Sequence, residues 1–75
     1  MNIETKTYKF VTPVDGHDYL GQVVITLING VVKGCTEFFI RPNGSLYSGN
    51  HYNDVPNYIN LDSAYDVEIK NTDIH

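Results

Sequence analysis

The chain has 75 residues, enough for one domain with one small core. Nine Asp and Glu against five Lys and Arg give a formal charge of −4, which argues against a general nucleic-acid binder with a basic face. A single cysteine excludes an internal disulfide, and no Cys and His pattern has the spacing of a zinc site. A chain this short buries about 60–65% of its unfolded surface, so we expect marginal stability and support from a partner or a second copy.

The N-terminal segment 1–12, MNIETKTYKFVT, begins with polar residues and then alternates. Its threonines and aromatic residues predict a strand whose buried face is centred on Tyr8 and Phe10. Lys6 and Lys9 suit a strand at the edge of a sheet, because charged side chains there discourage pairing with another sheet.

Segment 13–18, PVDGHD, predicts a connection, since proline lacks the N–H of a strand ladder and Asp15-Gly16 favours a turn. Asp15, His17 and Asp18 lie close together in this segment. No further ligand cluster accompanies them, so we expect no metal site.

The clearest structural signal is segment 19–40, YLGQVVITLINGVVKGCTEFFI, in which two apolar runs are joined by Asn29-Gly30. Asn and Gly tolerate the positive φ that both central residues of a type I′ turn require. The segment therefore predicts a β-hairpin, and counting outward from the turn pairs Ile28 with Val31.

This counted register divides the hairpin into two faces, because side chains alternate along a strand. The predicted core face is nearly all apolar and has the rungs Tyr19/Ile40, Gly21/Phe38, Val23/Thr36, Ile25/Gly34 and Leu27/Val32. The second face alternates apolar and polar rungs: Leu20/Phe39, Gln22/Glu37, Val24/Cys35, Thr26/Lys33 and Ile28/Val31. We expect either another segment of this chain or a partner to cover the second face. A homodimer would use Leu20, Val24, Ile28, Val31 and Phe39.

Segment 41–44, RPNG, predicts a second turn, and 45–48 a short strand that pairs back onto the strand ending at Ile40. Segment 49–58, GNHYNDVPNY, lacks apolar periodicity and predicts the longest loop. Its tyrosines and asparagines are adaptable contact residues, and long loops in small domains often carry function. A surface loop held by its own tyrosines is the structural alternative.

The C-terminal part predicts one further strand. Residues 59–61 resume an extended run, and 65–70, YDVEIK, alternates with its odd positions inward and its even positions outward. The spacing within 61–70 also permits a short helix, although we favour the strand. Segment 71–75 is a polar tail.

Together these elements predict an all-β fold, or α+β if 61–70 forms the short helix. About five short strands would form a small antiparallel meander centred on the hairpin 19–40 and rolled as a barrel or sandwich. The whole chain, 1–75, is expected to form a single domain.

The chain shows no combination of residues that predicts catalysis. A nucleophile needs an adjacent base and an orienting group, and Cys35 has neither beside it in the sequence. His17 and His51 lie near Asp18 and Asp54, but a domain of this size rarely encloses the pocket that acid–base catalysis needs. We therefore expect no enzyme, no catalytic residue, no metal and no cofactor.

A single-stranded nucleic-acid-binding β-barrel is one alternative function. Such barrels stack bases on aromatic side chains along a basic groove, and Tyr8, Tyr47, Tyr52 and Tyr58 are available for stacking. The five cations are scattered along the chain and would attract phosphate weakly, so direct nucleic-acid binding is not expected.

The cellular compartment is predicted from the cysteine content and from sequence features of export and membrane insertion. The lone cysteine suits a reducing compartment, no basic region followed by an apolar stretch stands near Met1, and the longest apolar run is too short for a bilayer. We expect a soluble, cytoplasmic protein with no membrane contact.

A very short, acidic, disulfide-free β-domain with a tyrosine-rich loop resembles, in size and composition, the small inhibitors encoded by phages and mobile elements, including anti-CRISPR and host-takeover proteins. The resemblance implies a non-enzymatic binding protein that occludes a larger protein or protein–nucleic acid complex in the host cell cytoplasm. The expected partner-binding residues are Tyr47, His51, Tyr52, Asp54, Tyr58, Asp66 and Glu68. A homo-oligomeric structural or virion component is the second alternative.

Overall fold

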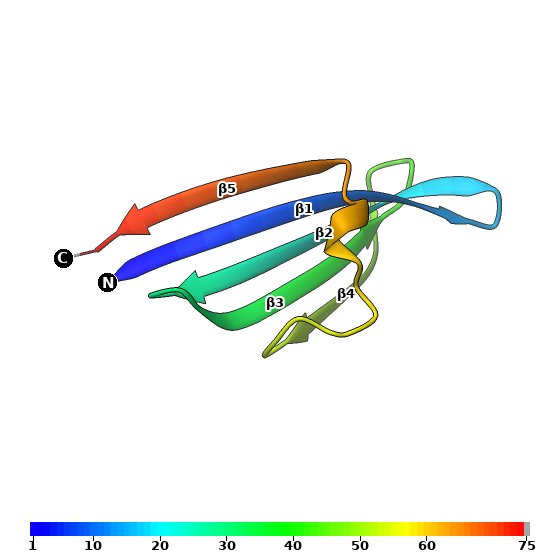
Figure 1. Cartoon of the computed structure of the whole chain (residues 1–75). Coiled ribbons are helices and arrows are strands. Elements are labelled where there is room, and N and C mark those ends of the chain that lie inside the picture. Colours follow the sequence, from blue (N-terminus) through cyan, green and yellow to red (C-terminus); the bar gives the residue numbers. More distant parts are fainter. Residues whose placement is uncertain (75) are drawn as a thin grey trace.

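The computed structural model describes residues 1–74, apart from the side chain of Val14 (Figure 1). Its strands are β1 (Asn2–Val14), β2 (His17–Ile28), β3 (Val31–Ile40), β4 (Leu46–Tyr52) and β5 (Asp66–Asp73), and a single 3₁₀ turn, η1, spans Leu61–Ser63. The strands pair antiparallel in one sheet with the order β4-β3-β2-β1-β5. The predicted five-stranded antiparallel fold is confirmed. The sheet is open, however, and does not close into a barrel or a two-sheet sandwich.

Two tight turns connect the three long strands. Asn29 and Gly30 have φ of 51° and 81°, as the predicted hairpin turn requires. Asp15 and Gly16, at 49° and 78°, form an equally short turn between β1 and β2. The turn predicted at Asp15-Gly16 is confirmed, but the other residues of segment 13–18 belong to β1 and β2.

The register of β2 against β3 changes at Lys33. Leu27 pairs with Val32 as predicted, but Thr26 pairs with Gly34. Lys33 is thus an extra residue on β3, a β-bulge. A shift of one residue moves every side chain beyond it to the other face of the sheet.

The counted register is consequently wrong for most of β3. Cys35 pairs with Ile25 and Glu37 with Val23, so both share the face of the predicted β2 core residues. Phe39 also lies on this face. It therefore cannot belong to the predicted homodimer surface, which is on the opposite face of the sheet.

One face of the sheet, the covered face, is crossed by the cover segment, residues 53–65. This segment leaves β4 at one edge of the sheet and reaches β5 at the opposite edge (Figure 1). The buried apolar residues beneath it are Val23, Ile25 and Cys35. Side chains from β1 and the cover pack around them, including Tyr8, Phe10, Val55, Ile59 and Leu61.

Several boundaries differ from prediction. Residues 49–52 belong to β4 rather than to a loop, and 59–61 belong to the cover rather than to a strand. β1 lies between β2 and β5, so it is not an edge strand. In β5 the alternation is as predicted, but Val67 and Ile69 remain 45% and 59% exposed because the cover does not extend over them.

The other face of the sheet, the open face, has no counterpart to the cover segment within residues 1–74. The apolar side chains that the strand pairing places on it include Ile3, Val11, Leu20, Val24, Ile28, Val31, Phe38, Ile40 and Leu46. A single layer makes the chain extended: its radius of gyration is 13.4 Å, against about 11 Å for a compact chain of this length.

Two neighbouring valines test this division between faces. Val23 is 3% exposed on the covered face, whereas Val24 points to the open face. We expect Val23→Ala to lower the free energy of unfolding by about 2–3 kcal/mol and Val24→Ala by under about 1 kcal/mol. Urea denaturation, at a concentration where the protein is monomeric, measures both changes in the free energy of unfolding. Equal losses in the two variants would show that the open face is covered as well.

Candidate functional site: a groove over a buried carboxylate

A groove of about 440 Å³ lies between the covered face and the cover segment. Strands β1, β2 and β3 form its floor, and the cover forms one wall. The residues that line it are Phe10, Val11, Thr12, Gly21, Gln22, Val23, Glu37, Phe39, Tyr58, Ile59, Asn60 and Ser63.

Glu37 is the charged group of this groove and is 5% exposed. The Tyr58 hydroxyl donates to its Oε1 at 3.0 Å, and Asn50 Nδ2 donates to the same oxygen at 3.5 Å. No hydrogen bond from the described residues reaches Oε2. The ion pairs found within residues 1–74 leave Glu37 without a cation. A carboxylate removed from water without a counter-charge is energetically costly.

A chain of hydroxyl groups supports this carboxylate. The hydroxyls of Tyr52 and Tyr58 lie 2.8 Å apart, and their rings meet edge to face with centroids 6.5 Å apart. Because the single Tyr58 proton is directed at Glu37, Tyr52 must donate to Tyr58. The chain thus runs from the Tyr52 hydroxyl through the Tyr58 hydroxyl to the Glu37 carboxylate.

Aromatic rings shape the floor of the groove around Gly21. A Cβ at Gly21 would lie 3.3 Å from Phe39 Cε1 and 3.6 Å from Phe10 Cβ. The absence of a side chain at this position lets the two phenylalanines approach from neighbouring strands. The groove thus combines apolar surface with one buried anion.

Cys35 lies on the same strand face as Glu37 and is fully buried. Burial, together with the charges of Glu37 and Asp54, raises the pKa of its thiol. A thiol that is buried and protonated is a poor nucleophile, so this cysteine serves as a packing residue.

The structure brings together only two of the predicted partner-binding residues around the groove described here, Tyr52 and Tyr58. Tyr47 instead contacts Tyr19, with ring centroids 5.2 Å apart, and lies under the Arg41 guanidinium. It is exposed, but it does not line the groove.

The other predicted residues lie elsewhere. His51 is on the open face, where its Nδ1 shares a 3.0 Å hydrogen bond with Thr36 Oγ1. Asp66 and Glu68 face the same side from β5, paired with Lys9 at 3.9 Å and Lys70 at 3.5 Å.

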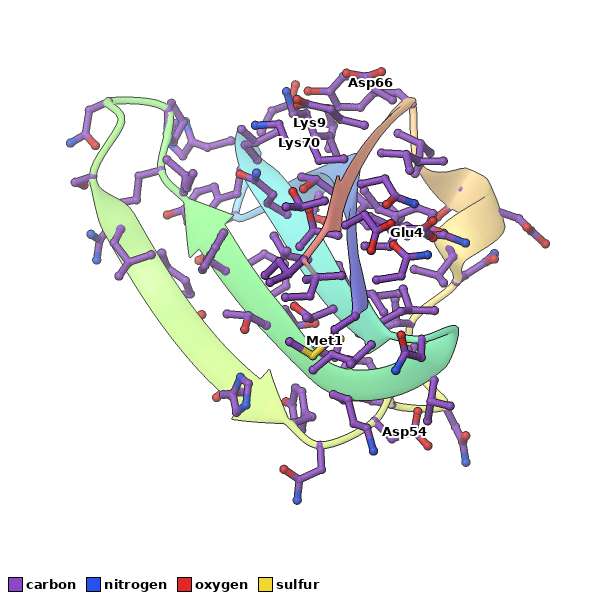
Figure 2. The ribbon with its side chains drawn as sticks, turned by 90° about the vertical axis from the view of Figure 1, so that its left-hand side faces the viewer. Met1, Glu4, Lys9, Asp54, Asp66 and Lys70 are labelled. Atoms are coloured by element: carbon purple, nitrogen blue, oxygen red, sulfur yellow. The ribbon has the colours of Figure 1, made fainter. Side chains whose placement is uncertain are left out.

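Asp54 lies at the start of the cover and accepts a hydrogen bond from the amide of Val55. Figure 2 shows it at the opposite end of the molecule from Asp66. Asp54 and Asp66, both predicted to bind a partner, therefore lie far apart in the structure.

Sequence reasoning missed Glu37 because the counted register placed it opposite Gln22 on the second face. One signal was present: a glycine inside a strand, here Gly34, often marks a bulge. The counted register instead pairs that glycine with Ile25 in a regular ladder.

Residues 1–74 contain no group of three His, Cys, Asp or Glu side chains arranged to hold a metal ion. Within the same range, no helix has the length and hydropathy needed to cross a membrane. Comparison with protein-family models, curated proteins and solved structures finds no match.

The burial of Cys35 predicts slow alkylation. We expect iodoacetamide to label the folded protein at least about 100-fold more slowly than the urea-unfolded chain at pH 8, because the thiol is inaccessible and its pKa is raised. Mass spectrometry of timed samples measures both rates. Equal rates in the folded and unfolded protein would place Cys35 at the surface.

The unpaired charge of Glu37 predicts that its removal stabilises the fold. Glu37→Gln keeps an oxygen that accepts from Tyr58 and removes the charge, so we expect the free energy of unfolding to rise by about 1 kcal/mol. Urea denaturation measures the change. A loss of more than about 1 kcal/mol would show that the ionised carboxylate is well compensated.

Proposed function

We propose that the protein is a non-enzymatic binding protein that occludes a surface of a larger protein or protein–nucleic acid complex. Inhibitors of this kind are encoded by phages and mobile elements, such as anti-CRISPR and host-takeover proteins. The observation that carries the proposal is the position of Tyr58: the residue is 66% exposed at the groove, while its hydroxyl donates a hydrogen bond to a buried carboxylate.

An exposed tyrosine held in this way suits recognition. Tyrosine supplies a large contact area at a small cost in rotamer entropy, and it is enriched among the residues that dominate binding energy. The hydrogen bonds to Tyr52 and Glu37 hold the Tyr58 ring in one orientation before a partner arrives.

The chemistry of the groove supports binding rather than turnover. The polar residues that line it are a glutamate, a tyrosine, a threonine, a glutamine, an asparagine and a serine, and the neighbouring thiol is buried. A nucleophile paired with a base, as covalent catalysis requires, is not among them.

A matched pair of tyrosines tests the proposal. Tyr58 and Tyr65 are similarly exposed, at 66% and 61%, but Tyr65 does not line the groove. In affinity capture from a lysate of the native host, we expect Tyr58→Ala to reduce recovery of the captured partner about tenfold or more and Tyr65→Ala to leave it unchanged. An equal loss of recovery in the two variants, or no loss in either, would show that Tyr58 is not part of the binding surface.

The open face favours a second candidate, a homo-oligomeric structural or virion component. Five strands about 4.8 Å apart and roughly eight residues of about 3.3 Å each give a face of about 600 Å². Two copies would bury about 1,200 Å² in total, at the lower end of stable interfaces. On β1 and β5 this face carries two lysines in ion pairs with two carboxylates. The charged side chains of these two ion pairs therefore cancel and add no net charge to an interface between two copies.

The dimer surface, corrected for the bulge, consists of Leu20, Val24, Ile28, Val31 and Phe38 in place of Phe39. If two copies pair here, Val24→Asp converts a dimer into a folded monomer in sedimentation-velocity experiments. Val67→Asp, an exposed position on the other side of the sheet, should leave the dimer intact. A wild-type monomer at all concentrations would exclude this candidate.

Single-strand binding has less support. Lys6, Lys9 and Lys70 each lie within 4 Å of a carboxylate, at 3.6, 3.9 and 3.5 Å. Such neighbours reduce the attraction of these cations for phosphate.

A further inference from the structure

We propose that the groove is a receptor for a cationic side chain, an arginine guanidinium presented by a protein partner. This inference rests on the proposed function, since it names the group of the occluded partner that enters the groove. It stands on two independent features, an apolar cavity and a buried carboxylate that lacks a counter-charge.

One oxygen of Glu37 lacks a hydrogen-bond partner among the described residues, and we infer that the groove gives access to it. Every fully enclosed side-chain nitrogen and oxygen among the described residues has a hydrogen-bond partner. Oε2 has none, so it is not fully enclosed, and Glu37 is one of the groove-lining residues. Glu37 as a residue is thus 5% exposed, and we infer that its carboxylate can be reached from the cavity. A cation that enters the cavity meets this charge in a medium less polar than water, where the attraction is stronger.

The walls of the cavity favour a guanidinium over an ammonium group. Phe10, Phe39 and Tyr58 supply aromatic surface around the carboxylate. A guanidinium is planar and weakly hydrated, and it stacks on aromatic rings while donating hydrogen bonds in its own plane. An ammonium group is compact and strongly hydrated, so it loses more hydration on entering the same space.

The size of the groove suits one side chain. A volume of about 440 Å³ accommodates an arginine side chain with its methylene groups. The exposed ring of Tyr58 would then contact the partner surface beside the inserted side chain.

The charged side chains of the cover segment, which forms one wall of the groove, are all negative. Residues 53–65 include Asp54 and Asp62 and contain no Lys or Arg. Both aspartates are exposed. Carboxylates around a site raise the local concentration of cationic groups and accelerate their association.

A titration with small probes tests the receptor directly. The ¹⁵N-labelled protein is titrated with N-acetyl-arginine amide, with its neutral isostere N-acetyl-citrulline amide and with N-acetyl-lysine amide. We expect saturable amide shifts at Gln22, Glu37 and Asn60 with the arginine probe, a Kd on the order of millimolar, and binding several-fold weaker for lysine and about tenfold or more weaker for citrulline.

Two glutamate variants locate the binding energy. Glu37→Gln should weaken arginine binding about tenfold or more, while Glu68→Gln, which removes an ion-paired carboxylate on the open face, should leave it unchanged. Shifts that do not saturate, citrulline binding equal to arginine, or an unchanged Kd in Glu37→Gln would overturn the receptor. Lysine binding as tight as arginine would overturn the guanidinium preference.

Affinity capture separates this inference from the proposed function. Recovery of a partner by the wild type and about tenfold less by Glu37→Gln supports both. Equal recovery by the two proteins keeps the proposed function and overturns the receptor. Arginine binding in the titration without capture of any partner overturns the proposed function and leaves a groove that binds guanidinium.

Discussion

The extra residue at Lys33 is the constraint on which the rest of the structure depends. With this bulge, β3 presents Cys35, Glu37 and Phe39 to the face that the cover segment crosses. Without it, those three side chains would point to the open face, and Thr36 and Phe38 would lie under the cover. The one-residue register shift therefore determines both what the core contains and where the charge of the groove lies.

The groove and the small core are two results of the same architecture. A short cover segment crosses an open sheet, so it buries a few side chains completely and leaves a cavity beside them. Glu37 lies between the two. It is 5% exposed, and it is also one of the residues that line the cavity. A domain with so little buried apolar surface has little stability to spare, and an unpaired buried carboxylate reduces it further. Under the proposed function this loss of stability is expected, because proteins often give up stability at functional sites.

The parts of the fold that follow from local chemistry could be predicted from the sequence. Asn29-Gly30 specifies its turn because few other residue pairs accept positive φ, and alternation identified β1 and β5. The bulge could not be derived by counting, because it depends on contacts between strands: Gly34 lies beneath His51 of β4, where an added Cβ would come within 3.3 Å of the imidazole. The path of the cover depends on the strand order, which hairpin patterns do not determine. Of the candidate site, Tyr52 and Tyr58 were predicted, while Glu37 could not be placed without the true register.

The most direct test of this account is the register of β2 against β3 in solution. Interstrand backbone nuclear Overhauser contacts report which residues lie opposite one another. The account predicts contacts between Val23 and Glu37 and between Ile25 and Cys35. Contacts of Val23 with Thr36 and of Val24 with Cys35 would mean that Lys33 pairs regularly, that Glu37 faces away from the cover, and that the groove holds no buried carboxylate.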